Sequence, residues 1–322
     1  MHTRFVDSCL RCRSSSIARN NAICFAMNAQ PRRVEHLQTD KGNVPVYTTA
    51  VVEQPWASYA REDHATWAAL FERQQEILVG RAAREFLDNQ RKFGMTPDAI
   101  PKFDDLNRVL RKTTGWELVG VEGLLPELTF FEHLANRRFP VTWWIRRPDQ
   151  IDYISEPDLF HDLFGHVPLL LNREFADYMQ AYGCGGVKAH GIGADALVNL
   201  TRLYWYTVEF GLIKQDDGLR IYGSGIVSSK GESIHCLESS APNRLGFDLK
   251  RIMRTRYRID TYQKTYFVID SYQQLMDATA PDFTPIYAEL ARQESIPAGN
   301  ILPSDFVYNR GTGEGWASDG DI

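Results

Sequence analysis

The chain has 322 residues, of which 43% are hydrophobic and 24% are charged, a composition typical of globular proteins. A chain of this length buries a large core without disulfides or structural metals. The formal net charge of −5 argues against a nucleic-acid partner or an anionic membrane surface, and no apolar run approaches the roughly 18 residues of a membrane span.

The N-terminal segment, residues 1–44, differs from the rest because it is rich in arginine and serine and has no apolar period. We expect this segment to be a disordered extension, or a non-native one that precedes a true start at Met27. The alternative is a mitochondrial transit peptide. Cys9 and Cys12 form a single CxxC, without the second pair of ligands that a zinc site needs. The odd total of five cysteines favours reduced thiols and a cytoplasmic location.

Apolar residues recur at steps of three and four between Tyr59 and Gly94, which predicts one long helix that tolerates Gly80 and ends at Gly94. The other predicted elements, in chain order, are a strand at 141–147, a helix at 158–166, a glycine-rich turn at 182–193, a helix at 195–213, and strands at 219–229 and 266–269. Together they predict one mostly helical α+β domain over residues 45–300, and the glycine-rich, acidic residues 301–322 are expected to form a loose tail.

Two histidines, His161 and His166, lie five residues apart in the stretch FHDLFGHVPLL. Five residues along a regular α-helix turn through about 500°, so the two side chains would point about 140° apart. They share a site only if the helix stops between them, and Gly165 offers such an end, with His166 returning from beyond it. The alternative is one histidine in the core and one on the surface.

A third polar residue in apolar company is Glu209, in the stretch YWYTVEFGL. A carboxylate is costly to bury there unless it is paired or bound to a metal, although it can also belong to a polar stripe on its helix. Two imidazoles and one carboxylate suit a non-haem ferrous site with open coordination positions, and the same ligand types serve hydrolytic zinc. Because the residue after His161 is Asp162 and the zinc-peptidase spacing is absent, the residues favour an iron oxygenase over a zinc hydrolase.

The segments around these residues supply aromatic and basic groups. Phe130 and Phe131 follow a loop with glycine and proline, where an exposed ring can stack on a flat heterocycle, or both rings can be core. Arg146 and Arg147 end the predicted strand, where one can hold a carboxylate or both can be ordinary surface residues. The glycine- and serine-rich residues 222–233 lack the form of a phosphate-binding loop.

Three stretches, EPDLFHDLFGHVPLL, YWYTVEFGL and YGSGIVSSKGE, resemble the pterin-dependent aromatic amino acid hydroxylases in order and spacing, and their short bacterial form most closely. The similarity also includes YAREDHATWAALFERQQEILVGRA and runs from about residue 46 to about residue 290. This resemblance implies the catalytic-domain fold of that family, α+β and mostly helical with a few short strands. It also implies a non-haem Fe(II), tetrahydropterin-dependent monooxygenase that converts L-phenylalanine to L-tyrosine with dioxygen and tetrahydrobiopterin or a related pterin.

The resemblance implies a role for individual residues as well. The iron ligands of the family fall on His161, His166 and Glu209, which are the expected catalytic centre. The pterin site of the family falls on four residues: Gly123, Leu125, Phe130 and Asp162. Its substrate site falls on five, with Arg146 at the substrate carboxylate and the others around the ring: Pro157, Trp205, Gly225 and Ser228.

The chain also departs from the animal members of that family. The stretch GLLPELTFFEHL replaces their serine-rich pterin loop, and Ile154 stands where they have a threonine. The regulatory domain and the C-terminal oligomerisation helix are not found, so we expect a monomer without substrate-driven activation. The resemblance implies a pterin-4a-carbinolamine dehydratase as pathway partner. The alternatives are a hydroxylase that prefers tryptophan or tyrosine, and a non-catalytic binding protein.

Overall fold

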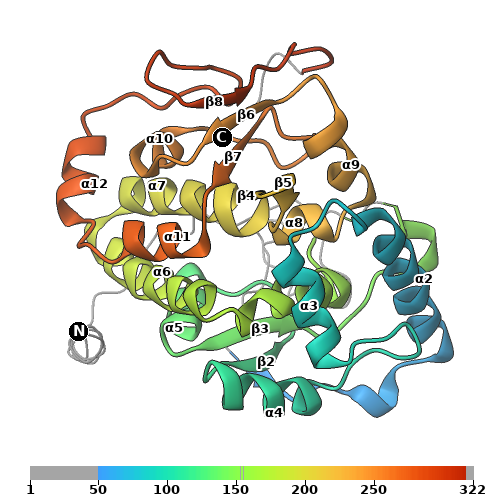
Figure 1. Ribbon diagram of the computed structural model, residues 1–322. Helices are drawn as coiled ribbons and strands as arrows, with labels where there is room; N and C mark the ends of the chain where they lie inside the picture. The colour runs from blue at the N-terminus through green and yellow to red at the C-terminus, as the bar shows by residue number, and fades with distance from the viewer. Residues whose placement is uncertain (1–49, 153, 155, 317–322) are drawn as a thin grey trace, which may run out of the picture.

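The computed structural model describes residues 50–152, 154 and 156–316. The expectations for residues 1–44, including Cys9 and Cys12, lie outside the described residues. Helices dominate and two small sheets lie on opposite sides of the molecule, as Figure 1 shows, with the long helix α6 between them. The predicted mostly helical α+β architecture is confirmed.

The first part of the chain forms helices α2 (Arg61–Leu78), α3 (Arg84–Phe93) and α4 (Phe103–Thr113), after a short 3₁₀ turn η1 (Trp56–Ser58). The single helix predicted over residues 59–94 is wrong, because Gly80 adopts a φ of +70° and the chain turns there. The backbone of Ala83 then donates to the carbonyl of Ile221, which fixes the break. Gly94 ends α3 in the left-handed conformation, as predicted.

The smaller sheet has the order β1-β2-β3, with β1 antiparallel to β2 and β2 parallel to β3. Its strands are β1 (Val51–Val52), β2 (Glu117–Val121) and β3 (Arg138–Thr142), and helix α5 (Glu127–Ala135) connects the parallel pair. The strand predicted at 141–147 therefore lies earlier in the chain. Beyond it, the backbone N–H groups of Thr142 and Arg146 donate to the carboxylates of Asp162 and Asp158 instead of to a neighbouring strand.

The central part of the chain contains helical segments of three kinds, 3₁₀, π and α. A 3₁₀ turn η2 (Pro148–Gln150) precedes the π-helical turn η3 (His161–His166) and the 3₁₀ turn η4 (Val167–Leu171). Helices α6 (Arg173–Ile192) and α7 (Ala194–Tyr204) follow, and the π-helical turn η5 (Trp205–Glu209) extends α7. The helix predicted over residues 195–213 is confirmed as far as Glu209, where the second π-helical turn ends.

The glycine-rich segment 182–193 was predicted to be a turn, and this prediction is wrong. The segment forms the C-terminal half of α6. A Cβ atom at Gly186 would overlap the ring of Phe131, and one at Gly183 would overlap Leu134 and the backbone of Ala135. Both glycines face α5. They are there because the two helices approach too closely for any side chain, and not because the backbone bends.

The larger sheet has the order β5-β4-β7-β6-β8. Its strands are β4 (Leu212–Gln215), β5 (Gly218–Ile221), β6 (Asn243–Gly246), β7 (Thr265–Ile269) and β8 (Val307–Asn309). Helices α8 (Ser224–Val227), α9 (Lys230–Glu238), α10 (Leu249–Arg254), α11 (Tyr272–Thr279) and α12 (Thr284–Leu290) connect and flank these strands.

Two predictions for this region need correction, and one is confirmed. The strand predicted at 266–269 is β7. The strand predicted at 219–229 stops at Ile221, because Gly223 lies so close to the backbone of Glu209 that the chain turns into α8. The tail after residue 300, expected to be loose, contains β8, which pairs with β6.

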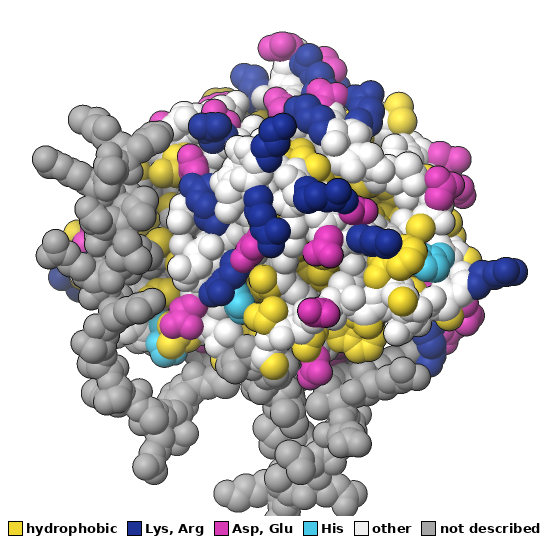
Figure 2. All heavy atoms as spheres, turned by 90° about the horizontal axis from the view of Figure 1, so that it is seen from below, with side chains coloured by type: hydrophobic (Ala, Val, Ile, Leu, Met, Phe, Trp, Pro, Cys, Tyr) yellow, Lys and Arg dark blue, Asp and Glu magenta, His cyan; other side chains and the backbone are white. Residues whose placement is uncertain are grey.

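One connected apolar core joins both sheets to the central helices, and its largest fully buried side chains include Trp67, Trp116, Phe160, Phe164 and Tyr206. The surface is charged: on the face shown in Figure 2, basic and acidic side chains lie interspersed. Among the described residues, no helix combines the length and the apolar character needed to cross a membrane.

Candidate active site

His161 and His166 occupy the first and last positions of the π-helical turn η3. In a π-helix each N–H group bonds to the carbonyl five residues back, so a step of five is close to one full turn. The two imidazoles therefore come together, with 3.1 Å between their Nε2 atoms. The prediction that the helix ends at Gly165 is wrong, because the helical backbone continues through both histidines into η4.

Glu209 is brought to the histidines by the second π-helical turn, η5, which it ends. Its Oε1 lies 3.3 Å from Nε2 of His166, and its Oε2 lies 3.7 Å from Nε2 of His161. The hydroxyl of Ser224 donates to Oε2 over 3.0 Å, which fixes the carboxylate from the side of α8. Two imidazoles and one carboxylate thus converge from two π-helical turns about 45 residues apart in sequence.

Burial and mutual charge set the ionisation of this cluster. Burial lowers the pKa of His161 to about 4, with the charge of His166 acting in the same direction against that of Glu209. Burial alone would raise the pKa of Glu209, but the neighbouring histidines and the Ser224 hydroxyl outweigh it and lower the pKa to about 2. A neutral imidazole beside an ionised carboxylate is the state in which both side chains bind a metal ion.

Ser228, expected in the ring pocket, lies against the first imidazole: Nδ1 of His161 is 2.9 Å from its hydroxyl oxygen. The hydroxyl proton of Ser228 goes to the carbonyl of Ser224, 2.7 Å away, so Ser228 accepts from Nδ1–H of His161. This hydrogen bond selects the tautomer whose Nε2 is unprotonated and faces Glu209.

Asp162 follows the first histidine and is buried beside the cluster. Together with His161 and His166 it offers ligand atoms that all lie within 4.8 Å of one another. One of its oxygens, Oδ2, accepts the backbone N–H of Thr142 over 2.7 Å. Burial raises the pKa of Asp162 to about 7, so this carboxyl differs in charge from Glu209 at neutral pH.

The expected pterin-stacking ring, Phe130, is partly exposed, whereas Phe131 is fully buried in the core. The ring of Phe130 meets the ring of Tyr204 edge-on at 6.0 Å, and Tyr204 lies nearly parallel to His166 at 6.4 Å. Phe130 is therefore connected to the histidines through a single ring. Before α5, a Cβ atom at Gly123 would meet nothing within 4 Å, so the loop that also carries Leu125 borders open space there.

Arg146 lies beside the cluster through Asp158, the first residue of the helix predicted over residues 158–166. Both are buried, and Nε and Nη2 of Arg146 bind the two carboxylate oxygens of Asp158 at 2.8 and 2.9 Å. Asp158 also accepts the backbone N–H of His161 over 3.1 Å, which caps the turn at His161. The bidentate face of Arg146 is therefore already occupied, and its Nη1 is the nitrogen left for a ligand.

The remaining expected pocket residues lie on η5, on α8 and directly before Asp158. Trp205 stacks on Tyr257, with ring centroids 4.4 Å apart, and on Phe210 at 4.6 Å. A Cβ atom at Gly225 would lie 3.1 Å from Oε2 of Glu209, so glycine lets α8 approach the carboxylate closely. Pro157 is half-buried immediately before Asp158.

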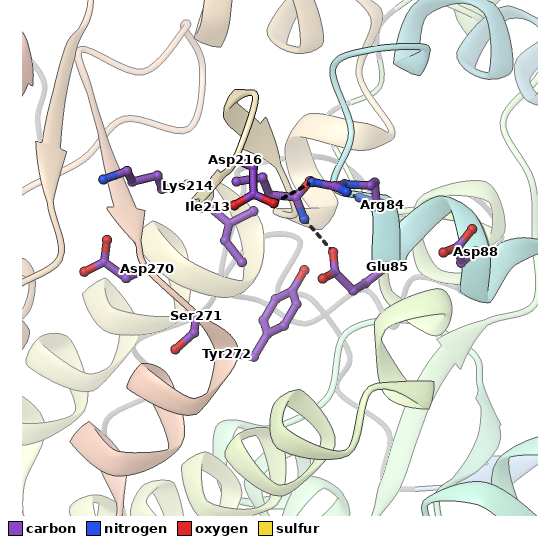
Figure 3. Close-up of a pocket in the computed structure, with 10 residues that line it drawn as sticks. Arg84, Glu85, Asp88, Ile213, Lys214, Asp216, Asp270, Ser271 and Tyr272 are labelled. Atoms are coloured by element: carbon purple, nitrogen blue, oxygen red, sulfur yellow. Dashed lines mark hydrogen bonds and ion pairs between the residues drawn. The ribbon is translucent and has the colours of Figure 1, made fainter.

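A separate depression, shown in Figure 3, lies between α3, β4 and α11. Two polar contacts lie within its lining: Arg84 pairs with Asp216 at 3.6 Å, and Gln215 donates to Glu85 over 2.7 Å. The histidines do not line it. Among the described residues, the converging metal-type ligands are those of η3 and η5.

The comparisons with known proteins agree with this geometry. The family described as biopterin-dependent aromatic amino acid hydroxylase matches residues 47–286. Phenylalanine-4-hydroxylase of Ralstonia nicotianae is 61% identical over 271 residues, which are 84% of this chain and 86% of the relative. That of Chromobacterium violaceum is 60% identical over 269 residues, 84% of this chain and 90% of the relative.

Solved structures are similar as well. The Chromobacterium violaceum phenylalanine hydroxylase with bound Fe(III) has a TM-score of 0.78 and 61% identity, covering 80% of this chain and 94% of that one. The same enzyme with iron(III) and 7,8-dihydrobiopterin has a TM-score of 0.77 and 59% identity, covering 80% and 93%. The resemblance inferred from the motifs is confirmed. On this agreement of sequence, fold and site, the chain belongs to the biopterin-dependent aromatic amino acid hydroxylase family.

Proposed function

We propose that this protein is a phenylalanine 4-monooxygenase, which converts L-phenylalanine to L-tyrosine with dioxygen, Fe(II) and tetrahydrobiopterin or a related tetrahydropterin. The observation that carries the proposal is the convergence of His161, His166 and Glu209. The relatives at about 60% identity are named phenylalanine-4-hydroxylases, and a related structure holds iron and dihydrobiopterin. With iron and pterin bound, the site would supply the electrons that dioxygen needs for insertion of one oxygen atom into an aromatic ring.

The three side chains fit a single metal ion. Nitrogen and oxygen ligands lie about 2.1 Å from such an ion, so neighbouring octahedral positions are about 3 Å apart. The separations here are 3.1, 3.3 and 3.7 Å. Two histidines and one carboxylate on one face leave the other coordination positions open, which is the arrangement of ferrous oxygenases.

We assign the carboxylate ligand to Glu209 and not to Asp162. Both oxygens of Glu209 point at the imidazoles, and its low pKa keeps it ionised at neutral pH. Asp162 accepts the backbone N–H of Thr142, and its pKa of about 7 leaves it half-protonated at neutral pH. Asp162 therefore takes the role of a group beside the pterin.

The other residues hold the reactants in this proposal. Phe130 offers its ring face to the pterin, in the loop region that includes Gly123 and Leu125. Nη1 of Arg146 binds the carboxylate of the amino acid, since Asp158 occupies the other side of the guanidinium. Four residues enclose the aromatic ring or orient its surroundings: Pro157, Trp205, Gly225 and Ser228.

Metal analysis of two matched variants tests the ligand assignment. Glu209→Gln and Asp162→Asn each replace one carboxyl group of the same cluster by its uncharged amide. After anaerobic loading with Fe(II) and desalting, we expect Glu209→Gln to bind iron more than about tenfold more weakly, whereas Asp162→Asn keeps its iron. Fe(II), but not Zn(II), should restore tyrosine formation in the wild type. A Glu209→Gln variant with full iron and turnover would refute the assignment.

A preference for tyrosine or tryptophan is the alternative substrate choice. The tyrosine 3-monooxygenase of Canis lupus familiaris is 37% identical over 227 residues, well below the phenylalanine-4-hydroxylases. This difference favours phenylalanine. Competition among the three amino acids, each carrying its own isotope label, tests it: tyrosine with the phenylalanine label should dominate the products, and a dominant hydroxylated tryptophan or hydroxylated tyrosine would reassign the substrate.

We also propose a monomeric protein in a reducing cytoplasm. The large exposed apolar side chains of the described residues come from separate segments of the chain, and scattered residues of this kind are normal on a monomer: Val51, Val79, Ile192, Ile234, Tyr262 and Phe306. Cys184 and Cys236 are free thiols. As pathway partner we propose a pterin-4a-carbinolamine dehydratase, which would remove water from the 4a-hydroxypterin product. Sedimentation that shows a stable tetramer would contradict the proposed monomer. Cell fractionation that finds the protein outside the cytoplasm would contradict the proposed location.

A further inference from the structure

Gln263 is a buried amide, 3% exposed, in the loop that precedes β7. Its Oε1 accepts the indole N–H of Trp205 over 2.9 Å. Its Nε2 donates to the carbonyl of Arg258 over 2.8 Å and lies 3.4 Å from that of Thr261. Because an indole nitrogen only donates and a carbonyl only accepts, the amide has one orientation that satisfies both sides.

The main chain of Gln263 is fixed independently. Its N–H donates to Oε1 of Glu232 over 3.1 Å, and the hydroxyl of Tyr266 donates to the same carboxylate oxygen. Glu232 lies on α9, which begins at the residue directly after the Ser228–Ser229 turn. Gln263 is thus held at its main chain by a buried group on a second element, and at its side-chain amide by carbonyls of its own loop.

Trp205 needs such a contact because its other neighbours are flat. It stacks on Tyr257 at an interplanar angle of 19°, and its other ring neighbour, Phe210, is tilted against it by 36°. Stacked rings hold the separation of their planes but resist sliding and rotation within the plane only weakly. The single directional contact that the structure gives the indole is N–H to Gln263. Trp205 also opens the π-helical turn that Glu209 ends.

We propose that Gln263 is a positioning residue for the hydroxylation: its carbonyl oxygen sets the in-plane orientation of Trp205 and so places the wall of the ring pocket relative to the metal ligands. This inference rests on the proposed function. Without the contact, the indole is free to rotate between its neighbours. The substrate ring is then held less well at the reacting position, and pterin is oxidised without formation of tyrosine.

The test measures coupling, defined as tyrosine formed per tetrahydropterin oxidised, together with the kcat and KM for phenylalanine. Gln263→Met keeps the length of the side chain and removes the acceptor. Gln263→Glu retains it, since a protonated glutamic acid accepts from the indole and donates to the carbonyl of Arg258. Gln90→Met is the control for the loss of a buried glutamine: Gln90 is also 3% exposed, but its hydrogen bond is to Gln75 of α2.

We expect Gln263→Met to bind iron as the wild type does and to lose coupling about fivefold, the effect of one net hydrogen bond. Gln263→Glu should restore coupling, and Gln90→Met should retain it even where its melting temperature falls. Near-ultraviolet circular dichroism of the Phe210–Trp205–Tyr257 stack should change in Gln263→Met alone. In a Trp205→Phe background, Gln263→Met should lower coupling no further, since no N–H is left to orient.

Unchanged coupling in Gln263→Met, or an equal loss in Gln90→Met, would overturn the inference and leave a structural role only. A wild type without pterin-dependent tyrosine formation would instead reject the proposed function. In that case the near-ultraviolet spectra still decide whether Gln263 orients Trp205: an unchanged spectrum in Gln263→Met rejects it.

Discussion

Asp158 shows how much a single residue contributes to this site. Its carboxylate is fully buried, receives the guanidinium of Arg146 at two oxygens and caps the turn that carries His161. Burial would raise the pKa of Asp158, but Arg146 more than offsets this and lowers it. One side chain thus links the expected substrate arginine to the first expected metal ligand.

Asp158→Asn should therefore be strongly destabilising. The substitution leaves the Arg146 guanidinium buried without a counter-charge, and breaking one side of a buried pair costs about 3 kcal/mol. Urea unfolding measures the loss. The matched control is Asp152→Asn, which removes the partner of Arg73 in a pair whose aspartate is 77% exposed, and should cost less than about 1 kcal/mol. Equal effects of the two substitutions would contradict this account of Asp158.

Glu232 predicts a dependence of stability on pH. Burial raises the pKa of its carboxyl from 4.5 to about 7, although Tyr266 and the N–H of Gln263 lower it in part. At a pH between 4.5 and about 7, Glu232 of the folded protein therefore holds a proton that the same residue has released in the unfolded chain. The stabilisation is therefore complete below about pH 4.5 and is lost as the pH rises through about 7, a change of about 3 kcal/mol.

Glu232→Gln removes this titration and keeps an acceptor oxygen for Gln263. Relative to the wild type, we expect the variant to gain about 3 kcal/mol in free energy of unfolding between pH 5 and pH 8. Unfolding in urea at both pH values measures the difference, and other titrating groups cancel because both proteins contain them. A difference between the two proteins that does not change with pH would show that Glu232 titrates normally.

At the scale of elements, the two π-helical turns bring the side chains of the site together. Glycines allow the neighbouring helices to approach these turns closely. A Cβ atom at Gly165 of η3 would lie 2.9 Å from the carbonyl oxygen of Ser224, at the start of α8. Ser224 also donates to Glu209 and accepts from Ser228. The distance between η3 and α8 therefore controls the hydrogen bonds of the ligand cluster.

Gly165→Ala should push α8 away from η3. Overpacking of this kind costs about 2 kcal/mol, and we expect weaker iron binding as well, because the contacts of Ser224 and Ser228 with the cluster lengthen. Thermal unfolding and iron content measure the two effects. Gly185→Ala on α6 is the control: its Cβ meets nothing within 4 Å, and alanine should stabilise the helix by up to about 1 kcal/mol. Full iron binding in Gly165→Ala would refute this role.

For the whole molecule, the site joins otherwise separate parts of the chain. Its proposed ligands come from η3 and η5, Ser224 begins α8 and Ser228 follows it, and Gln263 precedes β7 of the larger sheet. A metal ion bound only by the folded protein stabilises all of it together. At Fe(II) one hundred times above its dissociation constant, the gain is about 2.7 kcal/mol.

This gain should appear as a higher melting temperature of the wild type when Fe(II) is added under anaerobic conditions. Glu209→Ala should show no such rise when Fe(II) is added. The melting temperature of this variant without metal is the baseline for that comparison. An equal rise in both proteins would mean that iron binds elsewhere. Differential scanning calorimetry at fixed protein and metal concentrations measures both.

The sequence by itself determined the helical class, several element positions and the family. Apolar spacing is a local property, so it predicted the helix that opens at residue 195, the strand β7 and the end of α3 at Gly94. Motif order led to the proposed ligand set, because the residue types that bind a metal can be recognised in the sequence itself. The glycines of α6 were misread, since a helical glycine and a flexible one look alike until the facing helix is known.

Only the tertiary structure decided how the site is assembled. The choice between a regular and a π-helical turn at His161–His166 depends on which partners its side chains meet, and sequence spacing does not contain them. The same holds for the pairing of Asp158 with Arg146 and of Gln263 with Trp205, 12 and 58 residues apart. Contacts across such separations form when packing brings the elements together, and this is why the residue types were predictable and their hydrogen bonds were not.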